Sequence, residues 1–290
     1  MSYHVRAAGT RADASRTAPV RHLVLSPHYD DAALSLGGTI HALVQSGQQV
    51  WVVTVFAGGP PPGLSLSRVA RKLHQRMGQS GDALLRTRQA EDRAALQLLG
   101  ASSLWLSPRD AIYRRDPDSG AWCYPRPGRL FGAIHPLDLQ ALPALLSELD
   151  ERTEAADRSW SIYAPLGIGG HVDHQLARAL GERMAERGQS VSFYEDFPYA
   201  EPGRQGRGSR AGASMGQGPD GQLASPTTGL QPRLRSLTAV DLDARVESVL
   251  AYRSQLAHLL GDAQQAERRV RQFAETRGAD GPAERTWHRP

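Results

Sequence analysis

The stretch HLVLSPHYDD, residues 22–31, decides the fold and holds the first candidate functional side chains. Residues 22–26 are a short run of strand-forming residues that Pro27 ends, which predicts a buried strand. A helix is predicted over residues 32–45, and residues 50–56, VWVVTVF, are almost continuously apolar. That second run is typical of a parallel strand with both faces covered, so the chain begins with a strand–helix–strand unit.

The same alternation continues along the chain. Helices are predicted over residues 82–99, 139–149 and 172–187, and short strands over residues 104–106, 161–164 and 191–194. Alternating strands and helices predict an α/β fold, a mostly parallel sheet with helices on both faces. Ligands bind at the carboxyl ends of the strands of such a sheet. The loops after the first and fourth strands are therefore expected to meet at one edge.

One domain is expected, with flexible segments around it. The 290 residues include 40% hydrophobic residues, enough to bury a substantial core. We expect a disordered N-terminal arm over residues 1–20, a single domain over 21–277 and a frayed tail over 278–290. Residues 201–235 are rich in Gly, Ser, Arg, Pro and Gln, which predicts a long flexible insertion. Together with residues 57–81 it is expected to frame the substrate.

Composition excludes several classes of protein. The net charge of +4 is small and several arginines fall in the low-complexity stretch, so we expect no nucleic-acid partner. Cys123 is the single cysteine, which rules out an intrachain disulfide and a cysteine-based metal site. The first 20 residues lack an apolar signal core and no run approaches the length of a membrane span, so a soluble, cytoplasmic protein is the default expectation.

The first group of functional candidates follows the first strand. His28, Asp30 and Asp31 lie where a buried strand turns into a loop, and such a group is costly to bury unless a cation pairs it. Zinc binds imidazole nitrogen and carboxylate oxygen, so His28 and Asp31 can supply two ligands while Asp30 takes a proton from water. Helix capping by either aspartate is the alternative. Gly37 and Gly38, inside the predicted helix, indicate a close backbone approach or tight packing.

The second group, GGHVDH at residues 169–174, lies between the fourth strand and a helix. His171 and His174 share one face of a helical turn, so one can complete a His–Asp–His zinc site and the other can approach a substrate carbonyl. Asp173 can cap the helix or hold an imidazole tautomer. A histidine pair at a helix start is often only polar capping, but two such junctions after parallel strands favour a metal site.

Five further residues are candidates for substrate contacts. Arg88 and Glu91 can lie at the pocket, although a surface ion pair between them is the simpler explanation. Tyr194, Glu195 and Asp196 follow the fifth strand and should reach the same sheet edge, where they could contact sugar hydroxyls. A helix cap or a solvated loop is the alternative for these three.

These residues resemble the PIG-L/LmbE-like zinc-dependent N-deacetylases. The N-terminal motif of that family reads here as Pro27 to Asp31 followed by the Gly37–Gly38 pair, with Tyr29 in place of the usual proline. The downstream His-x-Asp-His motif is residues 171–174. Weaker elements are Arg88 to Gly100 and Tyr252 to Gln255, so the resemblance runs from about residue 22 to 260. The family fold is Rossmann-like, yet no G-x-G-x-x-G follows the first strand, and a dinucleotide cofactor is not expected.

The resemblance implies a role for each motif residue. His28, Asp31 and His174 would bind Zn²⁺ or another divalent metal, and Asp30 would be the general base. Protonated His171 would stabilise the oxyanion or act as general acid, with Asp173 orienting it.

The implied reaction is hydrolysis of an N-acetyl amide on an amino sugar or N-acetylglucosamine-type conjugate, releasing acetate. A small-molecule or oligosaccharide N-acetylated substrate is expected, and a homo-oligomer is possible. The alternatives are an amidase for larger thiol or glycoside conjugates and an inactive sugar-binding protein on this fold.

Overall fold

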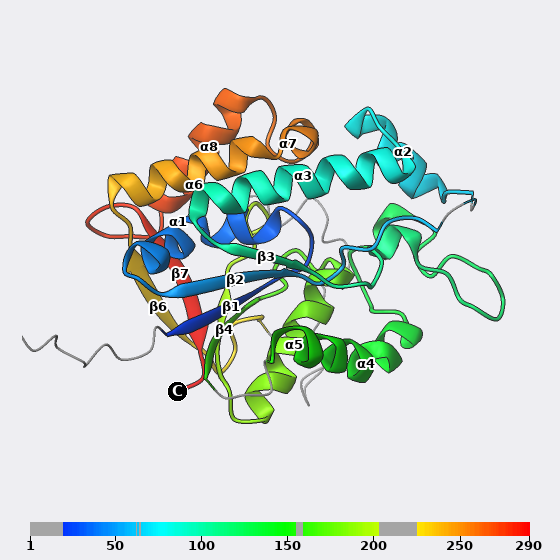
Figure 1. Cartoon of the computed structure of the whole chain (residues 1–290), viewed down its shortest axis with the longest axis horizontal. Coiled ribbons are helices and arrows are strands. Elements are labelled where there is room, and N and C mark those ends of the chain that lie inside the picture. The colour runs from blue at the N-terminus through cyan, green and yellow to red at the C-terminus, as the bar shows by residue number, and fades with distance from the viewer. Residues whose placement is uncertain (1–19, 62, 64, 155–158, 203–224) are drawn as a thin grey trace, which may run out of the picture.

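A computed structural model describes residues 20–61, 63, 65–154, 159–202 and 225–290 (Figure 1). Its centre is one seven-stranded sheet in the order β3-β2-β1-β4-β5-β7-β6. The first five strands are parallel: β1 Arg21–Ser26, β2 Gln49–Thr54, β3 Ser102–Trp105, β4 Trp160–Pro165 and β5 Ser190–Tyr194. Two antiparallel strands, β6 Gln231–Ser236 and β7 Ala283–His288, extend the sheet beyond β5. The predicted α/β class and mostly parallel sheet are confirmed.

Helices cover both faces of this sheet (Figure 1). One layer holds α4 Pro136–Thr153 and α5 Val172–Glu186. The other holds α1 Asp31–Gln45, α3 Gly81–Leu99, α6 Ala239–Ala251 and α8 Ala263–Glu275. The short helices α2 Arg68–Met77 and α7 Arg253–Leu259, with the 3-10 turns η1 Ala111–Tyr113 and η2 Pro127–Arg129, complete the described elements. Among the described residues, no helix combines the length and apolar character needed to cross a membrane.

Strand β1 shows why both faces are covered. Successive side chains of a strand point to opposite faces. Leu23 and Leu25 pack in the cluster under α4 and α5, whereas Val24 packs in the cluster with α1 and α3. All three side chains are at most 1% exposed. The continuous apolar pattern of the central strands therefore follows from burial on both sides.

The glycine pair of α1 serves packing rather than the candidate metal site. A Cβ at Gly37 would lie 2.8 Å from Cγ of Arg245 on α6, and one at Gly38 would lie 2.6 Å from Cδ1 of Leu237. The backbone N–H of Gly38 also donates to Oε1 of Glu284 at 3.0 Å. Of the two explanations for this pair, close packing of α1 against α6 and β7 is the one that the structure favours.

Two expectations about flexible segments need correction. The tail was expected to fray after residue 278, yet β7 pairs with both β5 and β6. Within the expected insertion over 201–235, residues 231–235 belong to β6, and residues 203–224 lie outside the described part. All six residues of β6 are exposed, so this edge strand carries no apolar pattern that could have revealed it. The expected arm over residues 1–20 also falls almost wholly outside the described residues.

Candidate metal centre and active site

The two predicted junctions meet at the carboxyl edge of the sheet. β1 and β4 are parallel neighbours, with Arg21 opposite Trp160. The chain leaves β1 through residues 27–30 into α1, and leaves β4 through residues 166–171 into α5. Both loops therefore start from the same end of adjacent strands, as the alternation predicted.

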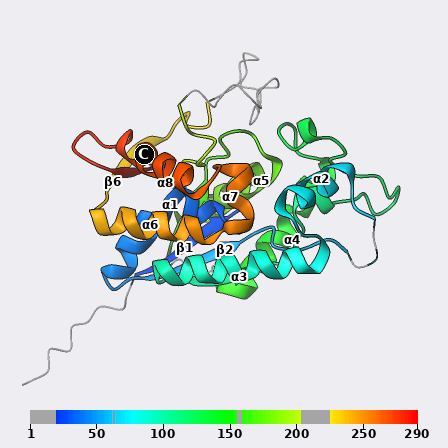
Figure 2. The same cartoon turned by 90° about the horizontal axis from the view of Figure 1, so that it is seen from above.

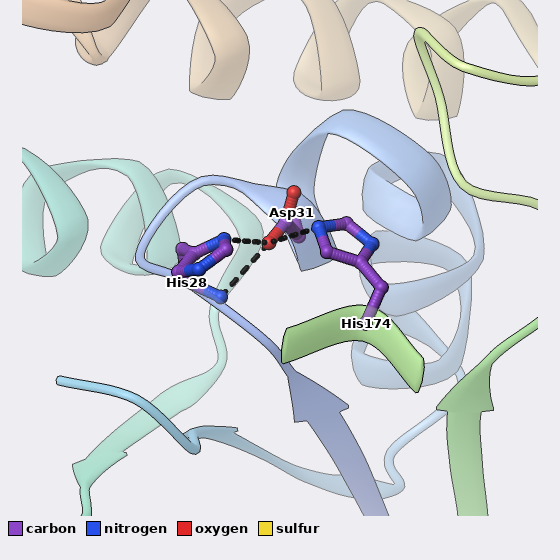
Figure 3. A group of neighbouring side chains, drawn as sticks. All are labelled: His28, Asp31 and His174. Atoms are coloured by element: carbon purple, nitrogen blue, oxygen red, sulfur yellow. Dashed lines mark hydrogen bonds and ion pairs between the residues drawn. The ribbon is translucent and has the colours of Figure 1, made fainter. Parts of the chain in front are cut away.

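His28, Asp31 and His174 converge there (Figure 3). Oδ2 of Asp31 lies 3.1 Å from Nδ1 of His28 and 3.4 Å from Nε2 of His174. The three side chains offer ligand atoms that all lie within 4.8 Å of one another. Two imidazoles and one carboxylate are a donor set that zinc accepts, and three protein ligands leave a position for water.

Two further carboxylates orient these imidazoles. Nε2 of His28 lies 3.0 Å from Oδ2 of Asp173, and Nδ1 of His174 lies 2.7 Å from Oδ1 of Asp196. Both aspartates are at most 1% exposed. A proton on each of these nitrogens leaves the opposite ring nitrogen of both histidines as a lone pair that faces Asp31. Metal-binding histidines commonly have such carboxylate partners, which fix the tautomer.

The charges in the trio of His28, Asp31 and His174 favour a positive charge at its centre. Burial alone would raise the pKa of Asp31, but the neighbouring charge and hydrogen bond of His174 hold it well below its usual range. Burial alone would lower the pKa of His174, but Asp31 and Asp196 raise it to about 9. A divalent cation takes the place of such imidazole protons when it binds. The site therefore fits a metal by charge as well as by donor type.

The sequence predicted that Asp173 orients His171, but the Asp173 side chain orients a different histidine. The Asp173 carboxylate contacts His28 and Arg114 and accepts the backbone N–H of Ala111 at 3.0 Å. It is the backbone N–H of Asp173 that reaches His171, donating to Nδ1 at 3.2 Å as part of the N-cap of α5. Asp173 therefore orients His28.

His171 lies beside the trio as a neutral ring. Its centroid is 5.1 Å from that of His28 and 5.5 Å from that of His174. Burial, followed by the charges of His28 and His174, holds the pKa of His171 well below its usual range. Because Nδ1 accepts a backbone N–H, the single proton of the neutral ring lies on Nε2. His171 is thus a hydrogen-bond donor, in place of the protonated imidazole expected from the sequence.

The Asp30 side chain does not cap helix α1, which was the alternative explanation for this residue. It occupies the N-cap position of α1 but its side chain makes no capping hydrogen bond. The Ser26 hydroxyl instead accepts the N–H of Ala32 at 3.0 Å. Burial, with the Asp31 charge adding to it, raises the pKa of Asp30 to about 6. A carboxylate with a pKa near neutrality is suited to taking up and releasing a proton.

A cavity of about 470 Å³ opens above these groups. Asp30, Asp31 and His171, which are 4%, 6% and 7% exposed, line its buried inner end together with His28. The outer walls come from α2, from residues 127–131, from Pro198 and Tyr199, and from α7. Residues 57–81 were expected to frame the substrate, and the part of them that forms α2 lines this cavity.

Arg88 is the one predicted substrate contact that reaches this cavity. Its guanidinium lies 5.1 Å from the centre of the Tyr29 ring, and Nη1 lies 3.9 Å from Oδ2 of Asp110. Glu91 points elsewhere and accepts hydrogen bonds from the backbone and hydroxyl of Ser254 at 2.8 and 2.6 Å. Arg88 and Glu91 therefore do not form the ion pair that was the alternative explanation for them.

The predicted sugar contacts of residues 194–196 are wrong. Tyr194 is fully buried and donates its hydroxyl to the carbonyl of Leu25 at 2.8 Å. Glu195 pairs with Arg277 and Arg285, which ties β5 to β7. Asp196 lies behind His174 and also accepts the N–H of Ile168 at 2.9 Å. None of the three lines the cavity.

Sequence reasoning missed two residues of the site. Asp110 lines the cavity, is 6% exposed and accepts the N–H of Ile112 at 3.1 Å. Arg114 forms ion pairs with both Asp173 and Asp138. Its Nη1 atom lies 2.5 Å from Oδ2 of Asp138. Both residues come from the irregular segment after β3. The sequence feature that could have indicated a functional role there is its high content of Arg, Asp and aromatic residues.

Comparisons with known proteins agree with this geometry. The profile of the PIG-L family, described as GlcNAc-PI de-N-acetylase, matches residues 23–185. A 2'-N-acetylparomamine deacetylase of Niallia circulans is 32% identical over 188 residues, which are 61% of this chain and 66% of that protein. The chain thus spans slightly less than two thirds of the length of this curated relative.

Solved structures resemble the chain over almost its whole length. A deacetylase of teicoplanin biosynthesis has a TM-score of 0.73 at 26% identity, covering 92% of this chain and 96% of that one. A structure described as the zinc-inhibited form of teicoplanin deacetylase Orf2 has a TM-score of 0.72 at 26% identity and covers 92% and 97%. Because the family profile spans more than half of the chain and includes both junctions of the site, the chain belongs to the PIG-L family.

Proposed function

We propose that the protein is a divalent-metal hydrolase that removes an acetyl group from the amide nitrogen of an amino sugar conjugate. The observation that carries this proposal is the convergence of His28, Asp31 and His174 beside Asp30 at the inner end of a cavity. The relatives named above, deacetylases of acetylparomamine and of teicoplanin biosynthesis, support an N-acetylated sugar as substrate.

His28, Asp31 and His174 would hold the metal. When bound, it would lower the pKa of a coordinated water and polarise the acetamide carbonyl. Zinc suits the donor set, and another divalent metal is compatible with it. A related deacetylase has a structure described as zinc-inhibited, so zinc in excess is worth testing as an inhibitor as well as an activator.

Asp30 would move the proton in this reaction. It lines the cavity beside Asp31, and its pKa of about 6 leaves it mostly ionised at pH 7. As base it would accept a proton from the attacking water, and it would return that proton to the amine nitrogen as the carbon–nitrogen bond breaks. The products are acetate and the free amine.

His171 would stabilise the oxyanion. Its neutral ring carries a proton on Nε2, and the ring lines the cavity next to the trio. A donor held in place before the reaction pays no reorganisation cost when negative charge develops on the carbonyl oxygen. A neutral imidazole is sufficient for this role.

Arg88 and Asp110 would bind the sugar ring. They lie at the inner end of the cavity and offer a donor fork and an acceptor within 3.9 Å of each other. Paired donors and acceptors of this kind match vicinal hydroxyl groups. A cytoplasmic location and a homo-oligomeric state stay predictions from the sequence.

The experiment is acetate release from a panel of N-acetylated amino sugars and their conjugates. We expect release with stoichiometric divalent metal and none after metal removal. Asp30→Asn should keep its metal and lose activity by about 100-fold or more. Arg68→Gln, which changes an exposed residue of α2 outside the cavity, is a matched control and should behave like the wild type. Full activity of the Asp30→Asn variant with metal bound would overturn the assignment of the base.

A further inference from the structure

Helix α2 forms one wall of the cavity through a single face. Val69, Leu73 and Met77 line the cavity, and so do Lys72 and Arg76. These positions follow the i, i+3, i+4, i+7 spacing of one helical face. Lys72 and Arg76 are one turn apart, about 6 Å along the helix axis.

Within the described part of the chain, no carboxylate pairs with either of these two cations. Both side chains are exposed, and among the residues that the structure describes neither takes part in an ion pair. The acidic residues that line the cavity, Asp30, Asp31 and Asp110, lie at its inner end. The cavity is therefore acidic where the metal would bind and basic along α2.

Helix α7 contributes a neutral side chain beside this basic wall. It lies next to α2 (Figure 2), and its His258 lines the same cavity. Burial, and after it the positive charges of Arg88 and Arg76, lower the pKa of His258 to about 4. The ring is therefore neutral at pH 7 and adds no negative charge that would offset Lys72 and Arg76.

We propose that the wall formed by Lys72 and Arg76 binds an anionic group of the substrate, a carboxylate or a phosphate, on the aglycone attached to the amino sugar. This inference rests on the proposed function, which places the acetamide at the inner end of the cavity. Val69, Leu73 and Met77 supply apolar surface between the two charges, which suits an aglycone with an apolar or aromatic body. A polyamine aglycone would meet like charges on this wall.

The test uses four matched aryl N-acetylglucosaminides. The aryl ring carries in turn no charge, a carboxylate, a phosphate or an aminomethyl group, and kcat/KM is measured for each. For the wild type we expect the two anionic substrates to exceed the neutral one and the cationic one to be poorest. The ratio of carboxylate to phosphate then identifies which anion the wall prefers.

Charge reversal locates the effect. Lys72→Glu combined with Arg76→Glu should lower kcat/KM for the anionic substrates by about tenfold and raise it for the cationic one. The neutral substrate should change by less than about twofold, because it carries no charge for either side chain to attract. Arg68→Glu reverses one charge on the same helix outside the cavity, half the charge change of the double variant, and it should leave the order of the four substrates unaltered.

A binding measurement separates this inference from the proposed function. Calorimetric titration of the carboxylate and aminomethyl glucosaminides reports their affinities whether or not the amide is cleaved. Tighter binding of the carboxylate compound that disappears in the Lys72/Arg76 variant supports the anionic wall even if no acetate is released. Equal affinity for both compounds, or an equal loss in Arg68→Glu, would overturn it.

Discussion

Asp173→Asn is expected to weaken divalent-metal binding by about 10- to 100-fold, although Asp173 is not proposed as a ligand. Its fully buried carboxylate holds Nε2 of His28 at 3.0 Å and thereby directs Nδ1 toward Asp31. Asparagine has nearly the same shape but no charge, and its amide group presents protons where His28 and Arg114 also donate. The substitution therefore removes the negative charge and one of the two acceptor oxygens that hold His28 and Arg114.

The size of the effect follows from this geometry. A loss of 10- to 100-fold in affinity corresponds to about 1.4 to 2.8 kcal/mol of metal-binding free energy. The apo protein should also lose about 1 to 3 kcal/mol of unfolding free energy, because a buried charged hydrogen bond is broken. That loss stays limited because Arg114 keeps its ion pair with Asp138.

Metal affinity should be measured by titration of the folded apo protein with Zn²⁺ or Co²⁺ in competition with a chelator. Asp138→Asn is the matched control, since it weakens the other ion pair of Arg114 and leaves the contact between Asp173 and His28 in place. We expect this control to lose stability but to bind metal within about threefold of wild type. If Asp173→Asn bound metal as tightly as Asp138→Asn, the orienting role of Asp173 would be refuted.

Three further predictions concern the same region. Asp196→Asn should lower metal affinity by about 10- to 100-fold, because it orients His174, whereas Glu195→Gln next to it should cost stability alone; equal metal affinity in the two variants would contradict this. His171→Ala should lower kcat by about 100-fold or more with little change in KM, measured as acetate release, and an unchanged kcat would exclude an oxyanion role. Burial raises the pKa of Asp92 to about 7, above its unfolded value, so the stability that its protonated form contributes is present below about pH 4 and lost as the pH rises through 7. Asp92→Asn should therefore reduce the fall in unfolding free energy between pH 4 and 8 by about 4 kcal/mol, measured by urea denaturation, and an unchanged fall would refute the assignment.

The convergence of the two His/Asp motifs could be predicted because it depends on local sequence and on one rule of topology. His28 and Asp31 follow a strand with an unmistakable apolar pattern, and His174 follows another such strand. Parallel neighbouring strands bring their carboxyl ends to one edge of the sheet. The strand order alone therefore predicts that the loops after β1 and β4 lie side by side.

The partners of the buried aspartates could not be predicted in the same way. Asp173 lies two residues after His171, yet the irregular segment between β3 and α4 brings Arg114 and the Ala111 N–H to its carboxylate, which directs it to His28. Residues 194–196 do reach the carboxyl edge of the sheet, but Tyr194 turns into the core and Asp196 turns behind His174. Direction of a side chain at a strand end depends on tertiary contacts that no local pattern contains.

The edge strands were hidden for a different reason. β7 continues the sheet with the sequence AERTWH, in which Glu284 is buried against Arg245 and the N–H groups of Gly38 and Thr39. A buried ion pair replaces the apolar residues that usually mark a strand facing a helix layer. Without that signal the segment resembles a frayed tail.

The central claim is that His28, Asp31 and His174 bind one divalent metal and that Asp30, next to them, acts as the general base. The most direct measurement compares metal content and acetate release of the purified wild type, the chelator-treated apo protein and the apo protein reloaded with one equivalent of metal. We predict that acetate release disappears with the metal and returns in proportion to the metal bound, and that His174→Ala neither binds metal at this stoichiometry nor recovers activity. Full acetate release from metal-free protein, or unchanged metal binding and activity in His174→Ala, would contradict the account.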